Sequence, residues 1–197
     1  MTTTMVLPLL KSWVQTAFSP RYLLLTNTLT GTVILATGDF LHQHSTNLKD
    51  RRELRTDWQR TIRIIAFSAL IFSPLNHFYY RWLDKSIIRG SRGQIVGKKV
   101  MVDTACGPVF ASTYVVGLNI MEGKSISNGF DEYRKKFLHF LALDACLWMP
   151  VQALNFYFVP PSFRVLFVSC AALVDSFFLA HIKQIESSDE SEEQRTD

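Results

Sequence analysis

The sequence predicts an all-α, polytopic membrane helical bundle with four spans and a further helix, because its charges are gathered and its apolar runs are long. Charged residues make up 19% of the 197 residues, and they fall mainly in three internal segments and the tail. Five apolar runs remain, each near the roughly 20 residues that cross a bilayer, and they leave too little polar surface for a soluble bundle. They cover residues 22–41, 62–83, 100–120, 137–159 and 163–182.

Residues 1–20 form an N-terminal segment ahead of the bundle. Leu10, Trp13, Val14 and Ala17 recur at helical spacing, and no acidic residue precedes position 39. The pattern is a weak form of a mitochondrial targeting helix. It fits equally well an amphipathic helix that lies in the membrane interface, and both interpretations stay open.

The first run begins the bundle, which is predicted to span residues 21–185. Asp39 and Gln43 stand four residues apart in this run and therefore share one helix face. Polar groups at this depth must face protein or water rather than lipid. Gly31 and Gly38, a heptad apart, permit another helix to approach closely.

The second run ends in a dense cluster of amphipathic side chains, SPLNHFYYRWLDK at residues 73–85. The YYRW stretch at 79–82 predicts an interfacial belt, with rings at headgroup depth and the arginine reaching water. His77, Arg81 and Asp84 share a helical face, and Arg81 stands three residues before Asp84. An anchor explains the aromatic residues, but it does not explain His77, which lies deeper.

The third and fourth runs also carry polar residues. The third holds Asp103, and the fourth holds Asp144, Trp148, Gln152 and Asn155. At a period of 3.6 residues, the last four fall within about 80° of one another. Such a stripe could line a path for a solute or an ion, or it could hydrogen-bond to other helices, and both interpretations stay open.

The last two runs are separated only by Pro160, Pro161 and Ser162. Because proline cannot continue a helix without losing a backbone bond, the pair forms either a tight hairpin or an interfacial helix followed by a span. Residues 186–197 contain six acids and one arginine. This composition predicts a disordered acidic tail.

Two basic loops flank the second run, so they lie on opposite sides of the membrane. Residues 49–63 carry six basic and three acidic side chains, and residues 81–99 carry six basic and one acidic. The stronger bias favours the second loop facing the matrix or cytosol. The loops could contact phosphate groups of lipid or RNA. The candidate basic surface comprises Arg60, Arg63, Arg89, Arg92, Lys98 and Lys99.

Catalysis is not expected. The chain has no GxSxG, HExxH, P-loop or GxGxxG motif in a fitting context. Cys106, Cys146 and Cys170 each sit in an apolar run without paired spacing, which predicts buried small hydrophobes rather than disulfides or a zinc site. No cofactor is therefore predicted.

Taken in order, the motifs resemble the Mpv-seventeen and peroxisomal membrane protein family, over residues 22–183. The resemblance implies an integral membrane protein with four spans, a mitochondrial address and the inner membrane. The residues that carry it are GDxxxQ from Gly38, RxxR at 60–63, PxxHxxYxxLD at 74–84, Lys99, Asp103, Pro108, and WMPVQALNFYFVPPSFR at 148–164.

Within the family, the chain is most similar to the Mpv-seventeen-like subfamily, on LLTNTLTG at 24–31 and FVPPSFR at 158–164. For that subfamily, the resemblance implies association with the mitochondrial ribosome and its assembly. For other members it implies a channel-like role in metabolite or reactive-oxygen homeostasis. Thr104, Ala145 and Val174 replace a glutamine and two tryptophans of the family pattern. These departures weaken a channel mechanism more than they weaken the fold.

We therefore expect a protein of the mitochondrial inner membrane that supports ribosome assembly and translation through its basic surface. The expected partners are the lipid bilayer, the large ribosomal subunit and a second copy of the chain, but not DNA. The alternative is a channel for small solutes. Its polar intramembrane seam would comprise Asp39, Gln43, His77, Asp103, Asp144, Trp148, Gln152 and Asn155.

Overall fold

The computed structural model describes residues 11–49 and 56–174, and within these ranges the chain is helical and has no strand. The all-α prediction is confirmed. A short helix covers residues 11–17, and a last helix runs to Val174. Between them lie α2 (Leu23–Lys49), α3 (Trp58–Phe67), a π-helical turn (Ser68–Phe72), α4 (Ser73–Ser86), α5 (Arg92–Met121), α6 (Ile126–Leu143), a second π-helical turn (Asp144–Trp148), α7 (Met149–Phe158) and a 3₁₀ turn (Pro161–Phe163).

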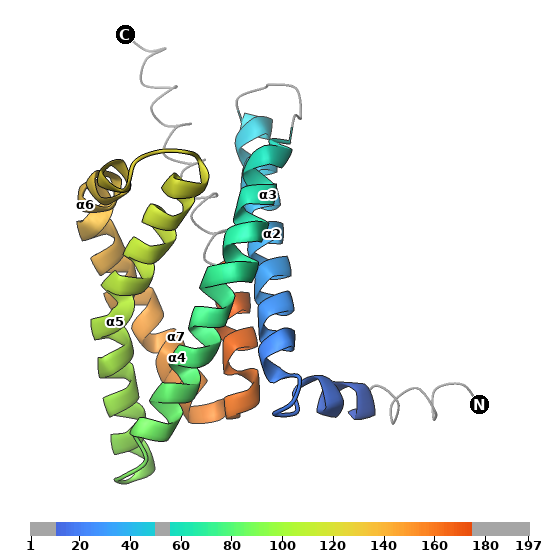
Figure 1. The fold of residues 1–197 in the computed structure, drawn as a ribbon. Helices are drawn as coiled ribbons and strands as arrows, with labels where there is room; N and C mark the ends of the chain where they lie inside the picture. Colours follow the sequence, from blue (N-terminus) through green and yellow to red (C-terminus); the bar gives the residue numbers. More distant parts are fainter. Residues whose placement is uncertain (1–10, 50–55, 175–197) are drawn as a thin grey trace.

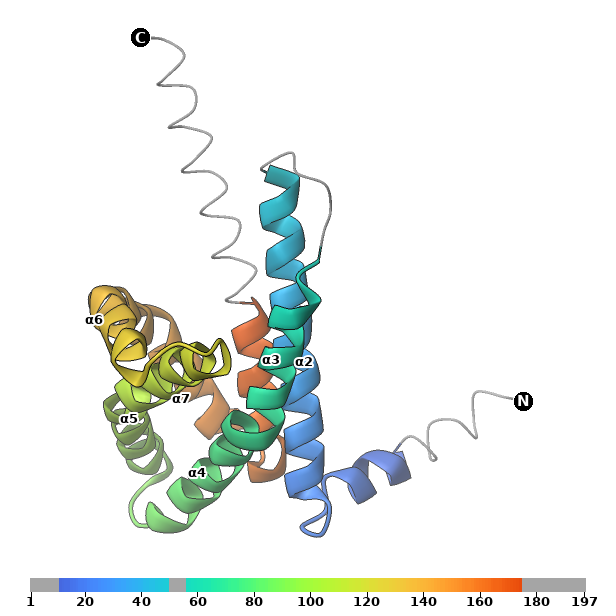
Figure 2. The ribbon, with the colours of Figure 1, turned by 45° about the horizontal axis from the view of Figure 1, so that its top comes forward.

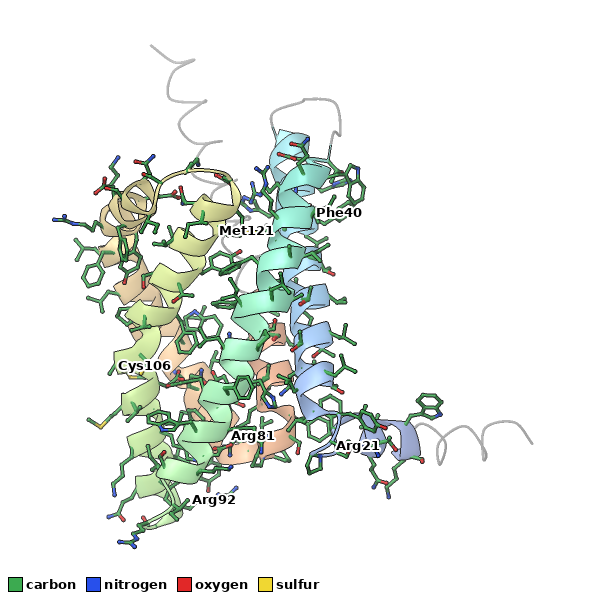
Figure 3. All side chains as sticks on the ribbon, in the orientation of Figure 1. Arg21, Phe40, Arg81, Arg92, Cys106 and Met121 are labelled. Atoms are coloured by element: carbon green, nitrogen blue, oxygen red, sulfur yellow. The ribbon has the colours of Figure 1, made fainter. Side chains whose placement is uncertain are left out.

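The helices form two antiparallel pairs (Figure 1). In the first pair, α2 runs one way and the continuous stretch α3–π turn–α4 returns beside it. In the second pair, α5 runs as α2 does, and α6–π turn–α7 returns. The turn from α4 to α5 lies at what we call the basic end, where Arg21, Arg81 and Arg92 are found (Figure 3). The turn from α5 to α6 lies at the opposite end.

Among the described residues, two helical stretches are long and apolar enough to cross a membrane, Trp58–Ser86 and Arg92–Met121. A shorter apolar helix covers Pro161–Val174. In α2, polar residues such as Asp39 interrupt the apolar pattern, and α6 begins among charged residues, so neither offers a continuous apolar stretch of this kind. The count of four spans therefore stays a prediction.

The chain reverses after α7 and returns into the bundle as a hairpin (Figures 1 and 2). Pro160 is extended and Pro161 opens the 3₁₀ turn, so the two prolines end α7 and redirect the chain. A Cβ placed on Gly31 of α2 would lie 2.7 Å from the Ser73 hydroxyl and 3.6 Å from that of Ser169. The last helix therefore packs against α2.

The helix at residues 11–17 turns sideways from α2 at the basic end (Figures 1 and 2). The Thr26 hydroxyl donates to the Ala17 carbonyl at 2.6 Å, and the Phe18 ring stacks on Phe163 with centroids 4.3 Å apart. Trp13 is left 74% exposed. Residues 1–10 and the acidic tail at 186–197 lie outside the described residues.

Each π-helical turn stands directly before a proline near the start of the next helix. Pro74 is the second residue of α4 and Pro150 is the second residue of α7. Proline has no N–H and its ring clashes with the carbonyl four residues earlier, which prevents regular α-helical bonding there. The wider turn accommodates the ring, so the helix continues instead of breaking.

The core lies towards the basic end, where Tyr80, Leu83, Phe156 and Val165 are buried together. These residues come from α4, α7 and the last helix, so one cluster joins the two helix pairs. Towards the opposite end, α3 and α5 meet at Gly117, where a Cβ would overlap the Phe67 ring. The absence of a side chain there lets the pairs close on each other.

Candidate functional site: buried polar groups and a basic end

The first polar cluster joins α2 to α3 near the opposite end. Gln43 Nε2 donates to Asp39 Oδ2 at 2.7 Å, as their spacing predicts, and the Thr61 hydroxyl donates to the same oxygen at 2.8 Å. Arg60 Nε lies 2.8 Å from Asp39 Oδ1 and neutralises the carboxylate. The backbone N–H of Asp57 donates to Gln43 Oε1 at 2.7 Å. This cluster fixes the entry of the chain into α3.

The second cluster joins α2 to α4 deeper in the bundle. Asn27 Nδ2 lies 2.9 Å from His77 Nδ1. An amide nitrogen only donates, so Nδ1 accepts and the imidazole proton sits on Nε2. Both side chains are fully buried, and neither His77 Nε2 nor Asn27 Oδ1 has a hydrogen-bond partner among the described residues. Beside them, the Ser68 and Ser73 hydroxyls bond to each other at 2.9 Å.

The third cluster joins α4 to α7. Gln152 Nε2 donates to the Tyr80 hydroxyl at 2.5 Å, and Asn155 Nδ2 donates to Gln152 Oε1 at 3.0 Å. Asn155 is fully buried, and its Oδ1 has no partner within the described part of the chain. The prediction that Tyr80 belongs to the interfacial belt is wrong, because this hydrogen bond holds its hydroxyl inside the protein. Trp82 of the same belt is exposed.

A buried ion cluster lies below the third cluster, towards the basic end. Lys99 Nζ is 2.6 Å from Asp84 Oδ1, and Arg164 pairs with the same oxygen. The side chains of Lys99 and Arg164 are only 7% and 8% exposed. Both cations also face the Phe156 ring, at 5.8 Å and 5.3 Å from its centroid. The cluster fastens α4, α5 and the last helix together.

This cluster corrects two predictions. Lys99 was expected on the basic surface, but it is buried because it follows the inward face of α5 to reach Asp84. Asp84 was expected beside Arg81, yet its partners come from other helices, and Arg81 is exposed. Arg164 stands eighty positions from Asp84, so no local pattern reveals that pair.

The predicted stripe on the fourth run is divided by the second π-helical turn. Gln152 and Asn155 lie within α7, whereas Asp144 and Trp148 bound the π turn. A π turn changes the angle between successive side chains, so the α-helical register does not extend back from Gln152 to Asp144. Trp148 is half-buried, and the side chain of Asp144 lies outside the described set.

Asp103 lies with Cys106 beside the Tyr79 hydroxyl of α4, and its charge also acts on Tyr80, the hydrogen-bond partner of Gln152. The predicted seam residues therefore fall into groups: Asp39 with Gln43, His77 with Asn27, and Asp103 near the Tyr80–Gln152–Asn155 bonds. Sequence reasoning missed Asn27, Thr61, Ser68 and Ser73, because single polar residues in apolar runs do not reveal which distant helix they meet.

Exposed cations lie at both ends of the bundle, and five of them come from the loop at the basic end. Arg81, Lys85, Arg89, Arg92 and Lys98 are exposed there, and the carboxylate of residues 81–99 is already held by buried partners. Figure 3 shows that Arg21, Arg81 and Arg92 lie towards this same end.

Arg60 and Arg63 belong to the opposite end, so the six predicted surface cations do not form one patch. Arg60 is half-exposed and paired with Asp39. Arg63 Nε donates to the Gln59 carbonyl at 3.2 Å. Within residues 11–49 and 56–174, no group of three or more His, Cys, Asp or Glu side chains is placed to hold a metal ion.

Comparison with known proteins identifies the family. Residues 119–180 match the Mpv17 / PMP22 family. Protein SYM1 of Mycosarcoma maydis is 34% identical over 82% of this chain and 79% of its own length. Mitochondrial inner membrane protein Mpv17 of Caenorhabditis briggsae is 26% identical over 76% of this chain and 80% of its own. Peroxisomal membrane protein 2 of Bos taurus is 27% identical over 82% and 83%.

No solved structure matches the chain. The identity to Protein SYM1 and the coverage of both chains nevertheless establish common descent over most of the chain. The chain therefore belongs to the Mpv17 / PMP22 family.

Proposed function

We propose that this chain is a multi-pass protein of the mitochondrial inner membrane that supports assembly and translation of the mitochondrial ribosome through its basic end. The observation that carries the proposal is the group of exposed cations at the basic end, Lys85, Arg89 and Lys98 among them, in a loop whose one acid, Asp84, is held by buried partners. Ribosomal RNA is a dense polyanion, and such a surface attracts it without sequence recognition. The relative named as a mitochondrial inner membrane protein supports the address.

Charge also supports an orientation. Residues 81–99 carry a net charge of +5 at the basic end. At the opposite end, residues 49–63 carry +3 and residues 122–136 carry +1. Because cations favour the side of the membrane on which they are retained, the basic end faces the matrix, where the ribosome is.

The test is sedimentation of gently solubilised mitochondria at low and high salt. Co-migration of the chain with the large ribosomal subunit, lost at high salt, is expected for a contact through exposed cations. A Lys85→Glu/Arg89→Glu/Lys98→Glu variant should lose co-migration at low salt. Arg134→Glu/Lys135→Glu, at the opposite end, should keep it. Migration of the unaltered chain only with light membrane complexes, at either salt, would contradict the proposal.

A second candidate is a pathway for small polar solutes, and one observation favours it. Asn27 Oδ1, His77 Nε2 and Asn155 Oδ1 are buried polar atoms without partners among the described residues. A buried polar group costs free energy unless it forms a hydrogen bond, so these atoms suit water or a passing solute. Asn155→Leu should then change the conductance of the reconstituted protein. An unchanged conductance, with normal abundance of the variant, would count against the pathway.

A further inference from the structure

The outer face of α5 lies open to the surroundings of the bundle. Only 6% of its most apolar stretch is buried against the rest of the protein. Met101 is 74% exposed, and Val109 is also exposed, eight residues further along. Gly97 and Gly93, four and eight residues before Met101, lie within about 80° of it around the helix and are exposed as well. In a bilayer, such a face meets acyl chains.

Exposed cations lie where this face begins, at the α4–α5 turn and the first turns of α5. Lys98 Nζ donates to the Arg89 carbonyl at 3.4 Å, so the Lys98 side chain reaches back along the α4–α5 turn. No carboxylate of the described residues forms an ion pair with Arg89 or Lys98. Asp84, the acid of this loop, is already shared by two buried cations. Positive charge is therefore available where α5 enters its apolar stretch.

The backbone of α5 is accessible between these cations and the apolar residues. A Cβ at Gly93 or Gly97 would meet no atom within 4 Å, so neither glycine is required for packing within the bundle. The two glycines leave a shallow strip beside Lys98. A molecule with a charged head and an apolar tail can lie there in close contact with the helix.

We infer that an acidic phospholipid docks at this strip. Its phosphate binds between Arg89 and Lys98, its glycerol portion lies against Gly93 and Gly97, and its acyl chains follow Met101. Charge complementarity selects an acidic headgroup over a neutral one, since each surface cation contributes about fivefold to the binding of an acidic lipid. A second copy of the chain fits less well, because a two-fold contact would bring the same cations together.

The test uses the full chain, purified in a neutral detergent, with dioleoylphosphatidylglycerol or dioleoylphosphatidylcholine added as the probe. Native mass spectrometry measures the bound lipid. Phosphatidylglycerol should bind more tightly than phosphatidylcholine. Arg89→Gln/Lys98→Gln should weaken its binding about 25-fold, which is the product of two fivefold losses. The matched control, Arg134→Gln/Lys135→Gln at the opposite end, should bind as the unaltered chain does.

Gly97→Leu tests the strip without changing any charge. The added side chain meets no neighbour and raises helix propensity, so the thermal midpoint without lipid should not fall. Phosphatidylglycerol affinity should still fall severalfold. This readout is independent of the ribosome proposal, because the purified chain contains no RNA.

Four results would overturn the inference. Equal binding of the two lipids would show that the site does not prefer an acidic headgroup. An equal loss of affinity in the control variant would show that Arg89 and Lys98 are not the binding residues. Unchanged binding in Gly97→Leu would show that the lipid does not lie against the two glycines. If Gly97→Leu instead abolished a lipid-independent dimer, the face would belong to a second copy of the chain.

Discussion

At the scale of single residues, the sequence predicted contacts between residues that are close in the chain but not contacts between residues that are far apart in it. Asp39 and Gln43 bond as their four-residue spacing predicts. Tyr80 and Gln152 stand far apart in the chain, and their bond draws into the core a tyrosine that local composition assigns to the membrane surface. The same reason explains Lys99, whose partner Asp84 lies on another helix.

Asp84→Asn is expected to destabilise the protein by about 3–5 kcal/mol, because it leaves Lys99 and Arg164 buried side by side without a carboxylate. Thermal and denaturant unfolding in detergent measure the change in the free energy of unfolding. Arg81→Gln is the matched control, since Arg81 is exposed and its loss should change stability by no more than about 0.5 kcal/mol. Equal effects of the two variants would contradict the assigned role of Asp84.

At the scale of the elements, the length of the apolar runs predicted where the helices lie. It did not predict where they depart from regular α-helical geometry. Pro74 and Pro150 were visible in the sequence, and each stands next to a π-helical turn that changes the helix register. A uniform helical period therefore failed across the segment that contains Asp144. The hairpin at Pro160 was one of two predicted alternatives, and the described residues adopt it.

Gly117→Ala is expected to destabilise the protein by about 1–3 kcal/mol, because the new methyl group would overlap the Phe67 ring where α5 meets α3. Gly97→Ala on the same helix has open space and should stabilise by up to about 1 kcal/mol through helix propensity. The thermal midpoints of both variants in the same detergent measure the contrast.

A second change tests the cause of the Gly117 effect. The double variant Phe67→Leu/Gly117→Ala should lose less stability than the sum of the losses in the two single variants, since the smaller side chain makes room for the methyl group. Additive losses in the double variant would show that the overlap is not the cause.

At the scale of the whole molecule, the structure separates the charges by end. The two basic loops were predicted to lie on opposite sides, and the fold does place residues 81–99 and the start of α3 at opposite ends (Figure 1). Sequence alone gave only a small difference between the loops. Among the described residues, Arg60 at the opposite end is paired with Asp39, whereas Arg89 and Lys98 have no carboxylate partner.

Orientation can be measured with single cysteines in a chain whose three native cysteines are replaced. In mitoplasts, a membrane-impermeant maleimide should label Lys124→Cys at once, because the opposite end faces outward if the basic end faces the matrix. Arg89→Cys should be labelled only after the inner membrane is permeabilised. The reverse pattern would place the cations on the outer side and remove the basis for ribosome contact.

The stacking of Phe18 on Phe163 has a consequence for the order of folding. The two rings are separated by most of the chain, so this contact forms only after the last helix has been synthesised, whereas the Thr26–Ala17 contact needs α2 alone. Contacts of such long sequence separation form slowly. If residues 11–17 act as a targeting helix, they would be accessible to import receptors during delivery and would complete their packing on the bundle afterwards. A targeting role and an interfacial role need not exclude each other, because they belong to different times in the life of the same helix.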